Sequence, residues 1–305
     1  MNSIQLTPVE ERSPGIAEIP PVILPSSDSP YTARAARLRH LAVDHAMADY
    51  LQFIAHVVES QQYLHEASPL PDEFIARLSD NVGTGSAPLS NAIFVEDRYW
   101  QHLLGQMIEK LYADASVSIR CTLDQLRDYD EAKLESIARS LLAGTFGEID
   151  SGQALFIWAA LSVYFRQLAS KLPAVGKVSL GEERQHCPVC ASTPVGSVIM
   201  IGAQSGLRYL QCGLCESRWH MVRIKCTNCE GTGRIDYWSV AETKVAIKAE
   251  SCGDCSTYLK VVYPEYDQEV ELLADDIASL AMDAEMEREG FSRSGISPFF
   301  FPGNA

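Results

Sequence analysis

The sequence contains no apolar run long enough to cross a membrane. The most apolar run, ALFIWAALSV (Ala154–Val163), is ten residues long, whereas a membrane-spanning helix needs about 20 apolar residues. The N-terminus also lacks the basic and apolar regions of a secretory signal, and no Arg-Arg pair lies near it. We therefore expect a soluble protein of the cytoplasm.

Basic residues are scarce. The chain has 25 Lys and Arg against 40 Asp and Glu, which gives a formal net charge of −15. Non-specific nucleic-acid binding depends on Lys and Arg that neutralise phosphates, so the composition disfavours it. The charge is uneven, because residues 181–260 hold nine basic and eight acidic residues. The excess of acid therefore lies in the flanking segments.

Familiar catalytic motifs are missing as well. The sequence shows no HExxH, no dinucleotide fingerprint and no pattern of nucleophile, His and acid. Two glycine-rich stretches, GTGS (Gly83–Ser86) and GTGR (Gly231–Arg234), lack the strand–loop–helix context of a phosphate-binding loop. Nothing in the sequence points to an enzyme, and we expect none.

The first half of the chain is typical of helices. Residues 1–30 contain six of the fifteen prolines, so we predict a flexible arm there. Residues 31–178 predict an all-α domain, because apolar residues recur at steps of three and four. We expect one long helix ending near residue 66, and further helices at about 72–78, 94–112, 122–126, 130–142 and 151–172. The last of these helices, with Ser151 as its N-cap, is apolar on nearly every side. This composition indicates that the helix lies at the centre of a helical bundle.

The second half is β-prone and rich in cysteine. Short strand-like runs occur at 197–201, 207–211, 219–224, 237–240, 245–249 and 258–263. An acidic helix is expected over about 268–289, with Gly290 at its C-terminal cap. Three adjacent phenylalanines, Phe299–Phe301, are expected to dock back on the protein, and the alternative is that they contact a partner.

Eight of the nine cysteines form four Cys-x-x-Cys pairs. In a reducing cytosol, close pairs of this kind indicate a metal site rather than disulfides. Two such turns supply four thiolates in a tetrahedron, which suits zinc or a single iron ion. We therefore predict two four-cysteine metal sites, and we expect the ninth cysteine, Cys121, to be buried in a helix. The predicted ligands are Cys187, Cys190, Cys212, Cys215, Cys226, Cys229, Cys252 and Cys255.

An internal repeat indicates how the pairs combine. Sequential, nested and interleaved arrangements are all conceivable. A shift of 39 residues places Cys187 on Cys226, and a shift of 40 places Cys212 on Cys252. Each unit then reads as cysteine turn, strand, turn, strand, cysteine turn, strand, which is typical of a zinc ribbon or rubredoxin-like module. The repeat favours sequential pairing, with one metal site in each module.

The predicted fold class is α+β. Residues 31–178 form the all-helical domain, and two tandem rubredoxin-like or zinc-ribbon modules, each with four cysteines, follow at 183–224 and 225–264. Residues 265–305 form the acidic C-terminal helix and the docking tail. Two histidines near the cysteines, His186 and His220, could donate hydrogen bonds to thiolates, although packing or surface roles are commoner for such residues.

Several stretches resemble the formate dehydrogenase accessory protein family, FdhE. These are HCPVCASTPVGSVIMIG, GLRYLQCGLCESRWHMVRIKCTNCEGTG, YWSV, IKAESCGDCSTYLK and SPFFFPG. They cover about residues 185–303 and include all four cysteine pairs. The resemblance implies a cytoplasmic maturation factor that binds iron through the eight cysteines, with zinc possible. It also implies contact with the catalytic subunit of a respiratory formate dehydrogenase that is exported by the twin-arginine route.

Two other functions remain open from the residues alone. A rubredoxin-like protein would use iron at the four-cysteine sites for electron transfer. A zinc ribbon that binds nucleic acid would use the positive charge of the ribbon, which includes Arg208, Arg218, Arg223 and Lys225. The overall acidity argues against the second of these, and self-association is left undetermined.

Overall fold

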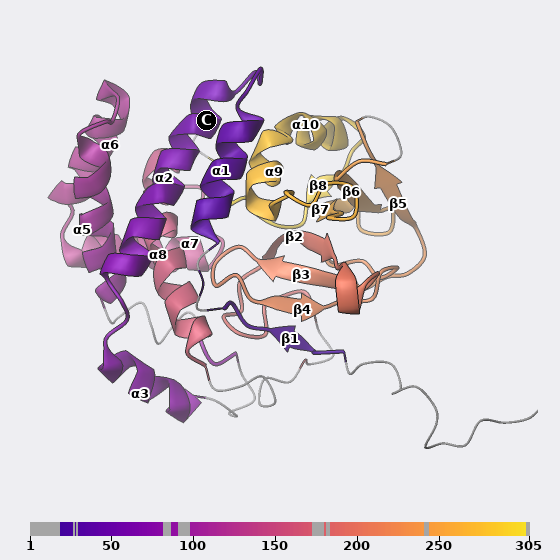
Figure 1. Ribbon diagram of the computed structural model, residues 1–305, viewed down its shortest axis with the longest axis horizontal. Helices are drawn as coiled ribbons and strands as arrows, with labels where there is room; N and C mark the ends of the chain where they lie inside the picture. The colour runs from indigo at the N-terminus through magenta and orange to yellow at the C-terminus, as the bar shows by residue number, and fades with distance from the viewer. Residues whose placement is uncertain are drawn as a thin grey trace, which may run out of the picture.

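A bundle of helices lies beside a β-sheet (Figure 1). This arrangement is seen in a computed structural model that describes residues 19–26, 28, 30–81, 87–90, 98–172, 180, 184–240 and 244–302. The predicted α+β class is confirmed, with helices first and a β-rich region with two cysteine clusters after them. Among the described residues, no helix combines the length and the apolarity that crossing a bilayer requires.

The helices of the first half follow the predicted order. They are α1 (Tyr31–Leu41), α2 (Ala48–Ala67), α3 (Asp72–Asn81), α5 (Tyr99–Tyr112), α6 (Val117–Asp128), α7 (Glu131–Leu142) and α8 (Ser151–Ser170). The expectation of one long helix ending near residue 66 was wrong, because the chain turns between α1 and α2. Asp44 takes a left-handed conformation in that turn, with φ 55°. The turn lets the apolar faces of the two helices pack against each other.

Helix α8 occupies the centre of the bundle, as its composition predicts. Every residue from Gln153 to Ala169 is buried. Its N-cap is Asp150 rather than the expected Ser151, since the Asp150 carboxylate accepts a hydrogen bond of 3.0 Å from the Gln153 N–H. Cys121 was also predicted wrongly. It is exposed on α6, because that helix buries Leu123 and Leu126 on its other face.

The second half of the chain, joined by one short strand from the N-terminal segment, forms one continuous sheet. Its strands are β1 (Val22–Ile23), β2 (Pro194–Ile199), β3 (Arg208–Cys212), β4 (Arg218–His220), β5 (Ile235–Trp238), β6 (Ile247–Cys252), β7 (Thr257–Val262) and β8 (Ser292–Arg293). The spatial order is β1-β4-β3-β2-β7-β6-β5, and β8 pairs with β7. Each cysteine module supplies three antiparallel strands. The modules join through parallel pairing of β2 with β7, where Ser197 is opposite Val261.

The described part of the predicted flexible arm is an edge strand. Val22 of β1 pairs with Trp219 of β4, and its side chain is fully buried. The Pro20 carbonyl accepts a hydrogen bond of 2.8 Å from the Tyr209 hydroxyl. The prolines led to the prediction of an irregular arm, but the apolar Val22 and the open edge of β4 fix residues 19–26 onto the sheet instead.

The acidic C-terminal helix is divided into α9 (Leu272–Ala278) and α10 (Leu280–Arg288), so the prediction of a single helix was wrong. The break lies at Ser279. The Nζ of the fully buried Lys260 lies 2.8 Å from the Asp276 carbonyl oxygen and 3.3 Å from that of Ser279. Carbonyls that accept bonds from Lys260 are drawn away from regular helix geometry. Gly290 directly follows the Glu289 C-cap of α10 with φ 87°, as the prediction of a glycine cap requires.

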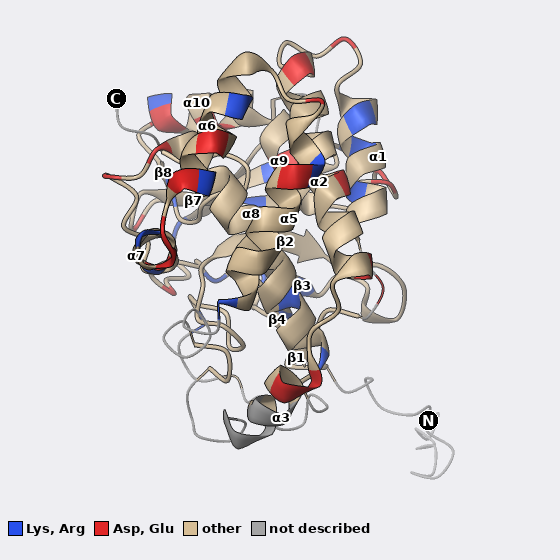
Figure 2. Ribbon diagram, turned by 90° about the vertical axis from the view of Figure 1, so that its left-hand side faces the viewer, with Lys and Arg blue, Asp and Glu red and all other residues tan. Residues whose placement is uncertain are grey.

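Arginine side chains of α1 connect the bundle to α9. Figure 2 shows Lys and Arg positions gathered on α1. Arg37 binds both carboxylate oxygens of Asp275, with Nε 2.9 Å from Oδ2 and Nη2 2.7 Å from Oδ1. One cluster of buried apolar side chains also runs from the helices into the sheet and includes Leu161 of α8 and Leu210 of β3. The two halves therefore share a core.

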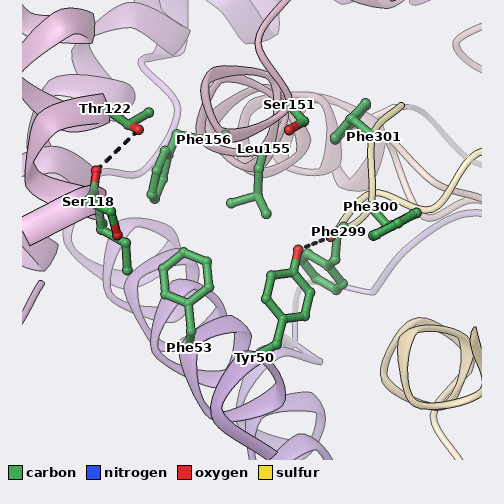
Figure 3. Close-up of a pocket in the computed structure, with 12 residues that line it drawn as sticks. Tyr50, Phe53, Ser118, Thr122, Ser151, Leu155, Phe156, Phe299, Phe300 and Phe301 are labelled. Atoms are coloured by element: carbon green, nitrogen blue, oxygen red, sulfur yellow. Dashed lines mark hydrogen bonds between the residues drawn. The ribbon is translucent and has the colours of Figure 1, made fainter. Parts of the chain in front are cut away.

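The tail after β8 folds back on the bundle. Phe299 and Phe301 are buried, whereas Phe300 is 52% exposed. The Tyr50 hydroxyl donates a hydrogen bond of 2.5 Å to the Phe299 carbonyl, and Figure 3 shows these side chains around one pocket. Docking of the phenylalanines is thus confirmed for two of the three.

Candidate metal centres

The first cysteine cluster consists of Cys187, Cys190, Cys212 and Cys215, all of them buried. The four sulfurs lie within 4.8 Å of one another. The Sγ atoms of Cys187 and Cys215 are 3.6 Å apart, and those of Cys190 and Cys212 are 3.4 Å apart. Tetrahedral bonds of about 2.3 Å to a central metal separate the sulfurs by about 3.8 Å. The cluster therefore has the dimensions of a closed tetrahedral metal site.

The second cluster consists of Cys226, Cys229, Cys252 and Cys255, again within 4.8 Å. The Sγ–Sγ distances from Cys226 to Cys255 and from Cys229 to Cys252 are both 3.7 Å. The cysteines are grouped sequentially, first with second pair and third with fourth, as the repeat in the sequence predicts. Four sulfur donors at these distances could hold zinc or a single iron ion in either cluster.

The local backbone explains how each pair converges. The residue after each second cysteine is left-handed: φ is 63° at Ala191, 60° at Glu216, 59° at Glu230 and 55° at Ser256. This conformation reverses the chain directly after the pair. Backbone N–H groups two residues after the first cysteine also point at its sulfur in three of the turns, at 3.3–3.4 Å. Such N–H groups stabilise thiolate charge.

The clusters differ in their exposure to solvent. All four cysteines of the first cluster are buried, whereas Cys229 is exposed and Cys255 is half-buried in the second. The first cluster lies against the helical bundle, where the Trp158 indole N–H donates a hydrogen bond of 3.1 Å to the Gly213 carbonyl. A metal in the first site would be enclosed by protein, and one in the second site would lie near the surface.

The pKa values of the cysteine thiols show why the clusters would need a bound cation to hold four thiolates. Burial raises the pKa of Cys187 and of Cys215 well above the usual thiol value. In the second cluster burial raises the pKa of Cys226 to about 12. Burial acts in the same direction on Cys255, but hydrogen bonds, first among them that of the Thr257 hydroxyl, lower its pKa to about 7. Four thiolates need a bound cation to balance their charge, so metal binding would displace these protons.

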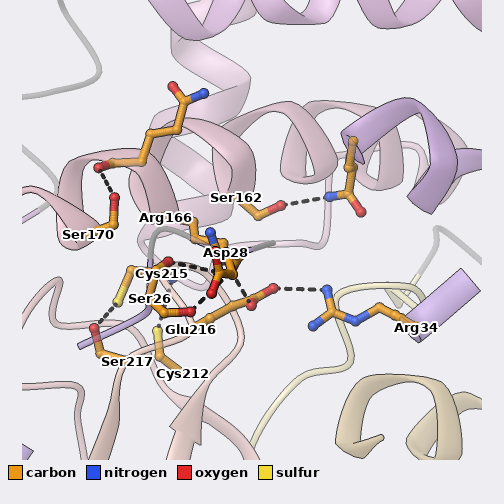
Figure 4. Close-up of polar contacts among 12 residues, drawn as sticks. Ser26, Asp28, Arg34, Ser162, Arg166, Ser170, Cys212, Cys215, Glu216 and Ser217 are labelled. Atoms are coloured by element: carbon orange, nitrogen blue, oxygen red, sulfur yellow. Dashed lines mark hydrogen bonds and ion pairs between the residues drawn. The ribbon is translucent and has the colours of Figure 1, made fainter. Parts of the chain in front are cut away.

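An ion-pair cluster connects the second cysteine turn, Cys212–Cys215, to the helices (Figure 4). Glu216 follows Cys215 directly, and its carboxylate is almost buried. Arg34 of α1 approaches it with Nη1 at 2.8 Å, and Arg166 of α8 with Nε at 3.3 Å. Burial alone would raise the pKa of Glu216, but the two guanidinium groups outweigh it and lower that pKa. Glu216 therefore anchors the turn as a carboxylate.

Neither histidine considered from the sequence contacts a cysteine sulfur by a hydrogen bond in the described part of the chain. His220 stacks edge-on against Tyr209, with ring centroids 5.6 Å apart. Burial, with help from the charge of Arg184, lowers its pKa. The sequence analysis missed the Arg34–Glu216 pair. A glutamate follows the second cysteine in two of the four turns, at Glu216 and Glu230, but this pattern does not identify a partner 182 positions away.

Comparison with known families agrees with this geometry. Family models described as FdhE N-terminal, FdhE central domain and FdhE C-terminal domain match residues 19–182, 186–223 and 224–300. The chain belongs to the FdhE family. The boundary between the FdhE central and C-terminal matches falls between the two cysteine clusters. Each of these two family domains thus carries one complete cluster of four cysteines.

Relatives in the FdhE family match over almost the whole chain. A protein FdhE homolog from Yersinia pestis (strain Pestoides F) is 47% identical over 98% of this chain and 97% of its own length. A homolog from Serratia proteamaculans (strain 568) is 46% identical over 99% of this chain and all of its own. The crystal structure of the FdhE protein from Pseudomonas aeruginosa superposes with a TM-score of 0.83 at 33% identity, covering 93% of this chain and 100% of that one.

Proposed function

We propose that this protein is a metal-containing accessory factor for the maturation of respiratory formate dehydrogenase. It acts in the cytoplasm and binds the catalytic subunit before that subunit is exported by the twin-arginine route. The observation that carries the proposal is the full-length match to the FdhE family together with two complete four-cysteine clusters. A factor of this kind binds its client without transforming a substrate, in keeping with a sequence that shows no catalytic motif.

The eight clustered cysteines are the proposed metal ligands. Cys187, Cys190, Cys212 and Cys215 would hold one ion, and Cys226, Cys229, Cys252 and Cys255 the other. The resemblance to the FdhE family favours iron, and zinc satisfies the same four thiolates. In either case a bound ion would tie the two cysteine turns of a module together, which a β-module this small needs for stability.

Deletion of the gene tests the maturation role. Formate-dependent dye reduction by the membrane fraction should fall to background and return when the wild-type gene is supplied. Complementation with the Cys187→Ser and Cys226→Ser variants separates the contributions of the two sites, and a Cys121→Ser variant serves as the control, because Cys121 lies in neither cluster. Undiminished dye reduction in the deletion strain would contradict the proposal.

An anaerobic pull-down tests the partner and the metal together. The tagged protein should retain the catalytic subunit of formate dehydrogenase, and metal analysis of the eluate should give two ions per chain. Recovery of the protein with its metals but without the catalytic subunit, when that subunit is expressed at the same time, would contradict the proposed partner. Fewer than two ions per chain after anaerobic purification would contradict one of the metal sites.

Electron transfer is the second candidate, and one observation favours it. The exposed Cys229 brings the second cluster to the surface, where an iron ion could exchange electrons with another protein. Visible and paramagnetic resonance spectra of the anaerobically purified protein show whether the sites hold iron. Stoichiometric zinc would exclude a role in electron transfer. The nucleic-acid alternative has less support, since Arg208 is buried in an ion pair with Glu250 and Lys225 pairs with Glu230.

A further inference from the structure

A polar cavity lies between the helical bundle, the first cysteine module and the N-terminal segment. Its volume is about 410 Å³. Helices α1 and α8 contribute Arg34 and Arg166, and strand β4 contributes Arg218. Three acidic residues, Asp28, Glu216 and Glu271, complete the charged lining. The N-terminal segment forms another wall, with Ile23, Leu24, Pro25, Ser26, Asp28 and Pro30. None of these residues belongs to the predicted metal ligands.

The two glutamates of the cavity are already engaged by two of its arginines. Arg34 Nη1 lies 2.8 Å from Glu216, and Arg34 Nη2 lies 3.0 Å from Glu271. Arg166 Nε lies 3.3 Å from the other oxygen of Glu216. Asp28 also lines the cavity, but its side chain makes no ion pair with any of the three arginines, and its backbone carbonyl accepts a 2.6 Å hydrogen bond from Arg166.

Arg218 is the arginine of this cavity that has no carboxylate partner among the described residues. Its Nε donates a hydrogen bond of 2.9 Å to the Gln211 amide oxygen, and this is the one hydrogen bond of its side chain in the described part of the chain, where it has no ion pair. Burial therefore lowers the pKa of Arg218. Burial acts in the same direction on Arg34, but there Glu216 and Glu271 outweigh it and raise the pKa. Glu271 and Glu216 also act on Arg218 and raise its pKa, but they do not outweigh its burial, so Arg218 is the arginine of the cavity whose charge is least compensated.

Two further nitrogen atoms of the cavity arginines lack partners among the described residues. The Nε of Arg34 and the Nη1 of Arg166 are buried and make no hydrogen bond there. Both side chains are almost fully buried. Both guanidinium groups lie over the Tyr31 ring, with their central carbons 5.5 Å and 5.9 Å from its centroid, so these nitrogens are enclosed by protein and do not face the cavity. Arg218 is therefore the arginine left to bind an acceptor in the cavity, and an anion forms stronger hydrogen bonds to arginine than neutral groups do.

We propose that this cavity binds a small organic anion through a carboxylate or phosphate group, with Arg218 as the principal contact. Both groups match the planar fork of a guanidinium. The volume exceeds that of the charged group alone, so the ligand can carry a polar body. Because Glu216 directly follows Cys215, a bound anion would lie beside the second cysteine turn and the N-terminal segment. The inference does not depend on the proposed role in formate dehydrogenase maturation.

Titration with acetate and with inorganic phosphate tests the proposal. The full-length protein, with its metals as isolated, is titrated with each anion at constant ionic strength, with chloride as the reference. Ligand-observed NMR should show saturable binding of at least one of the two anions, and Tm should rise with the same concentration dependence. Whether acetate or phosphate binds more tightly identifies the class of charged group.

The Arg218→Gln variant tests whether the anion binds at Arg218. It removes the charge but breaks none of the ion pairs described above, so we expect it to fold. It should weaken Kd by about tenfold or more, as expected for loss of a charge-assisted hydrogen bond. Arg223→Gln is the matched control, because Arg223 is exposed and lies outside the cavity; it should bind as the wild type does.

If Arg218→Gln does not fold, Arg218→Lys replaces it, because lysine keeps the charge and loses the planar fork. That variant should also weaken binding while Arg223→Gln does not. The proposal is overturned if the wild type shows no saturable binding of either anion. It is equally overturned if Arg218→Gln, or its Lys replacement, binds with the affinity of the wild type.

Discussion

Arg208 and Glu250 form a buried ion pair in which Arg208 Nη2 lies 2.8 Å from Glu250 Oε1. Arg208 belongs to β3 of the first module and Glu250 to β6 of the second. The same guanidinium donates to the Lys225 carbonyl at 3.1 Å and to the Thr227 hydroxyl at 3.0 Å, next to the third cysteine turn. This arginine thus connects the two cysteine modules on one side of the parallel β2–β7 pairing.

Replacing Arg208 should destabilise the protein strongly. Arg208→Ala leaves the Glu250 carboxylate buried without its partner, which costs about 3–5 kcal/mol in comparable proteins. Urea unfolding followed by far-UV circular dichroism measures the loss. Arg223→Ala is the control, because Arg223 is exposed, and its free energy of unfolding should stay within about 0.5 kcal/mol of the wild type. Equal stability of the two variants would show that the pair does not hold the modules together.

The two proposed metal sites should release their ions at different rates. A chelator, added with a mercurial that reacts with thiols, reaches the exposed Cys229 of the second site directly. It reaches the first site, where all four cysteines are buried, after local opening of the protein. We expect two kinetic phases of similar amplitude, detected by a metal indicator, with the second site as the fast one.

Variants of single cysteines assign the phases. Cys229→Ser should remove the fast phase and leave the slow one, and Cys190→Ser should do the reverse. Exposed Cys121 provides the control, because Cys121→Ser should leave both phases unchanged. A single phase for both sites in the wild type would contradict the link between burial and release.

The cysteine clusters were predictable from the sequence because their geometry is local and repeated. A Cys-x-x-Cys turn brings its own two sulfurs together, and the 39- and 40-residue shifts show which turns belong to one module. No such signal exists for contacts between remote segments. Arg34 and Glu216 are 182 positions apart, and the parallel pairing of Ser197 with Val261 depends on how the modules meet.

The two wrong predictions of a single continuous helix have the same physical origin. The apolar stripe from Leu38 to Val58 continues across the turn at Asp44, because both helices bury their stripes in one core. The break between α9 and α10 depends on Lys260, a residue of the neighbouring strand whose Nζ binds helix carbonyls. In both places tertiary contacts override a periodic pattern that reads as a single helix.

Asp276 should make stability depend on pH. This fully buried carboxylate pairs with Lys260 at 3.1 Å and Arg293 at 2.7 Å. Burial would raise its pKa, but Arg293 and Lys260 outweigh that effect and lower it. The stabilisation is therefore complete above the ordinary Asp pKa of about 4, and it is lost progressively as the pH falls below that value and through the lower folded-state pKa. Asp276→Asn should cost about 3 kcal/mol at pH 7, and the difference from wild type should shrink only once the pH falls below about 4.

Urea unfolding of both chains at a series of pH values between 7 and 3.5 measures this difference. Loss of metal at low pH affects the wild type and the variant alike, so their difference isolates the carboxylate. Asp236→Asn is the control, because Asp236 is exposed and forms no ion pair with any described residue. A difference between Asp276→Asn and wild type that stays constant over the whole range would contradict the ion-pair origin.

The C-terminal tail should stabilise the first metal site from a distance. The Phe301 ring lies 5.5 Å from that of Trp158, whose indole N–H donates to the Gly213 carbonyl inside the second cysteine turn. Phe301→Ala removes a buried ring and should cost about 3–5 kcal/mol. Because it also frees Trp158 to move, it should accelerate the slow phase of metal release and leave the fast phase unchanged.

Phe300 offers the matched control for this effect. It is the same residue type one position earlier but is 52% exposed, so Phe300→Ala should change the free energy of unfolding by less than about 0.5 kcal/mol. Metal release from Phe300→Ala should follow the wild type in both phases. If Phe301→Ala lowers stability but releases metal like Phe300→Ala, the tail contributes to the core alone. A faster slow phase in Phe301→Ala alone means that the contact through Trp158 holds the cysteine turn in place.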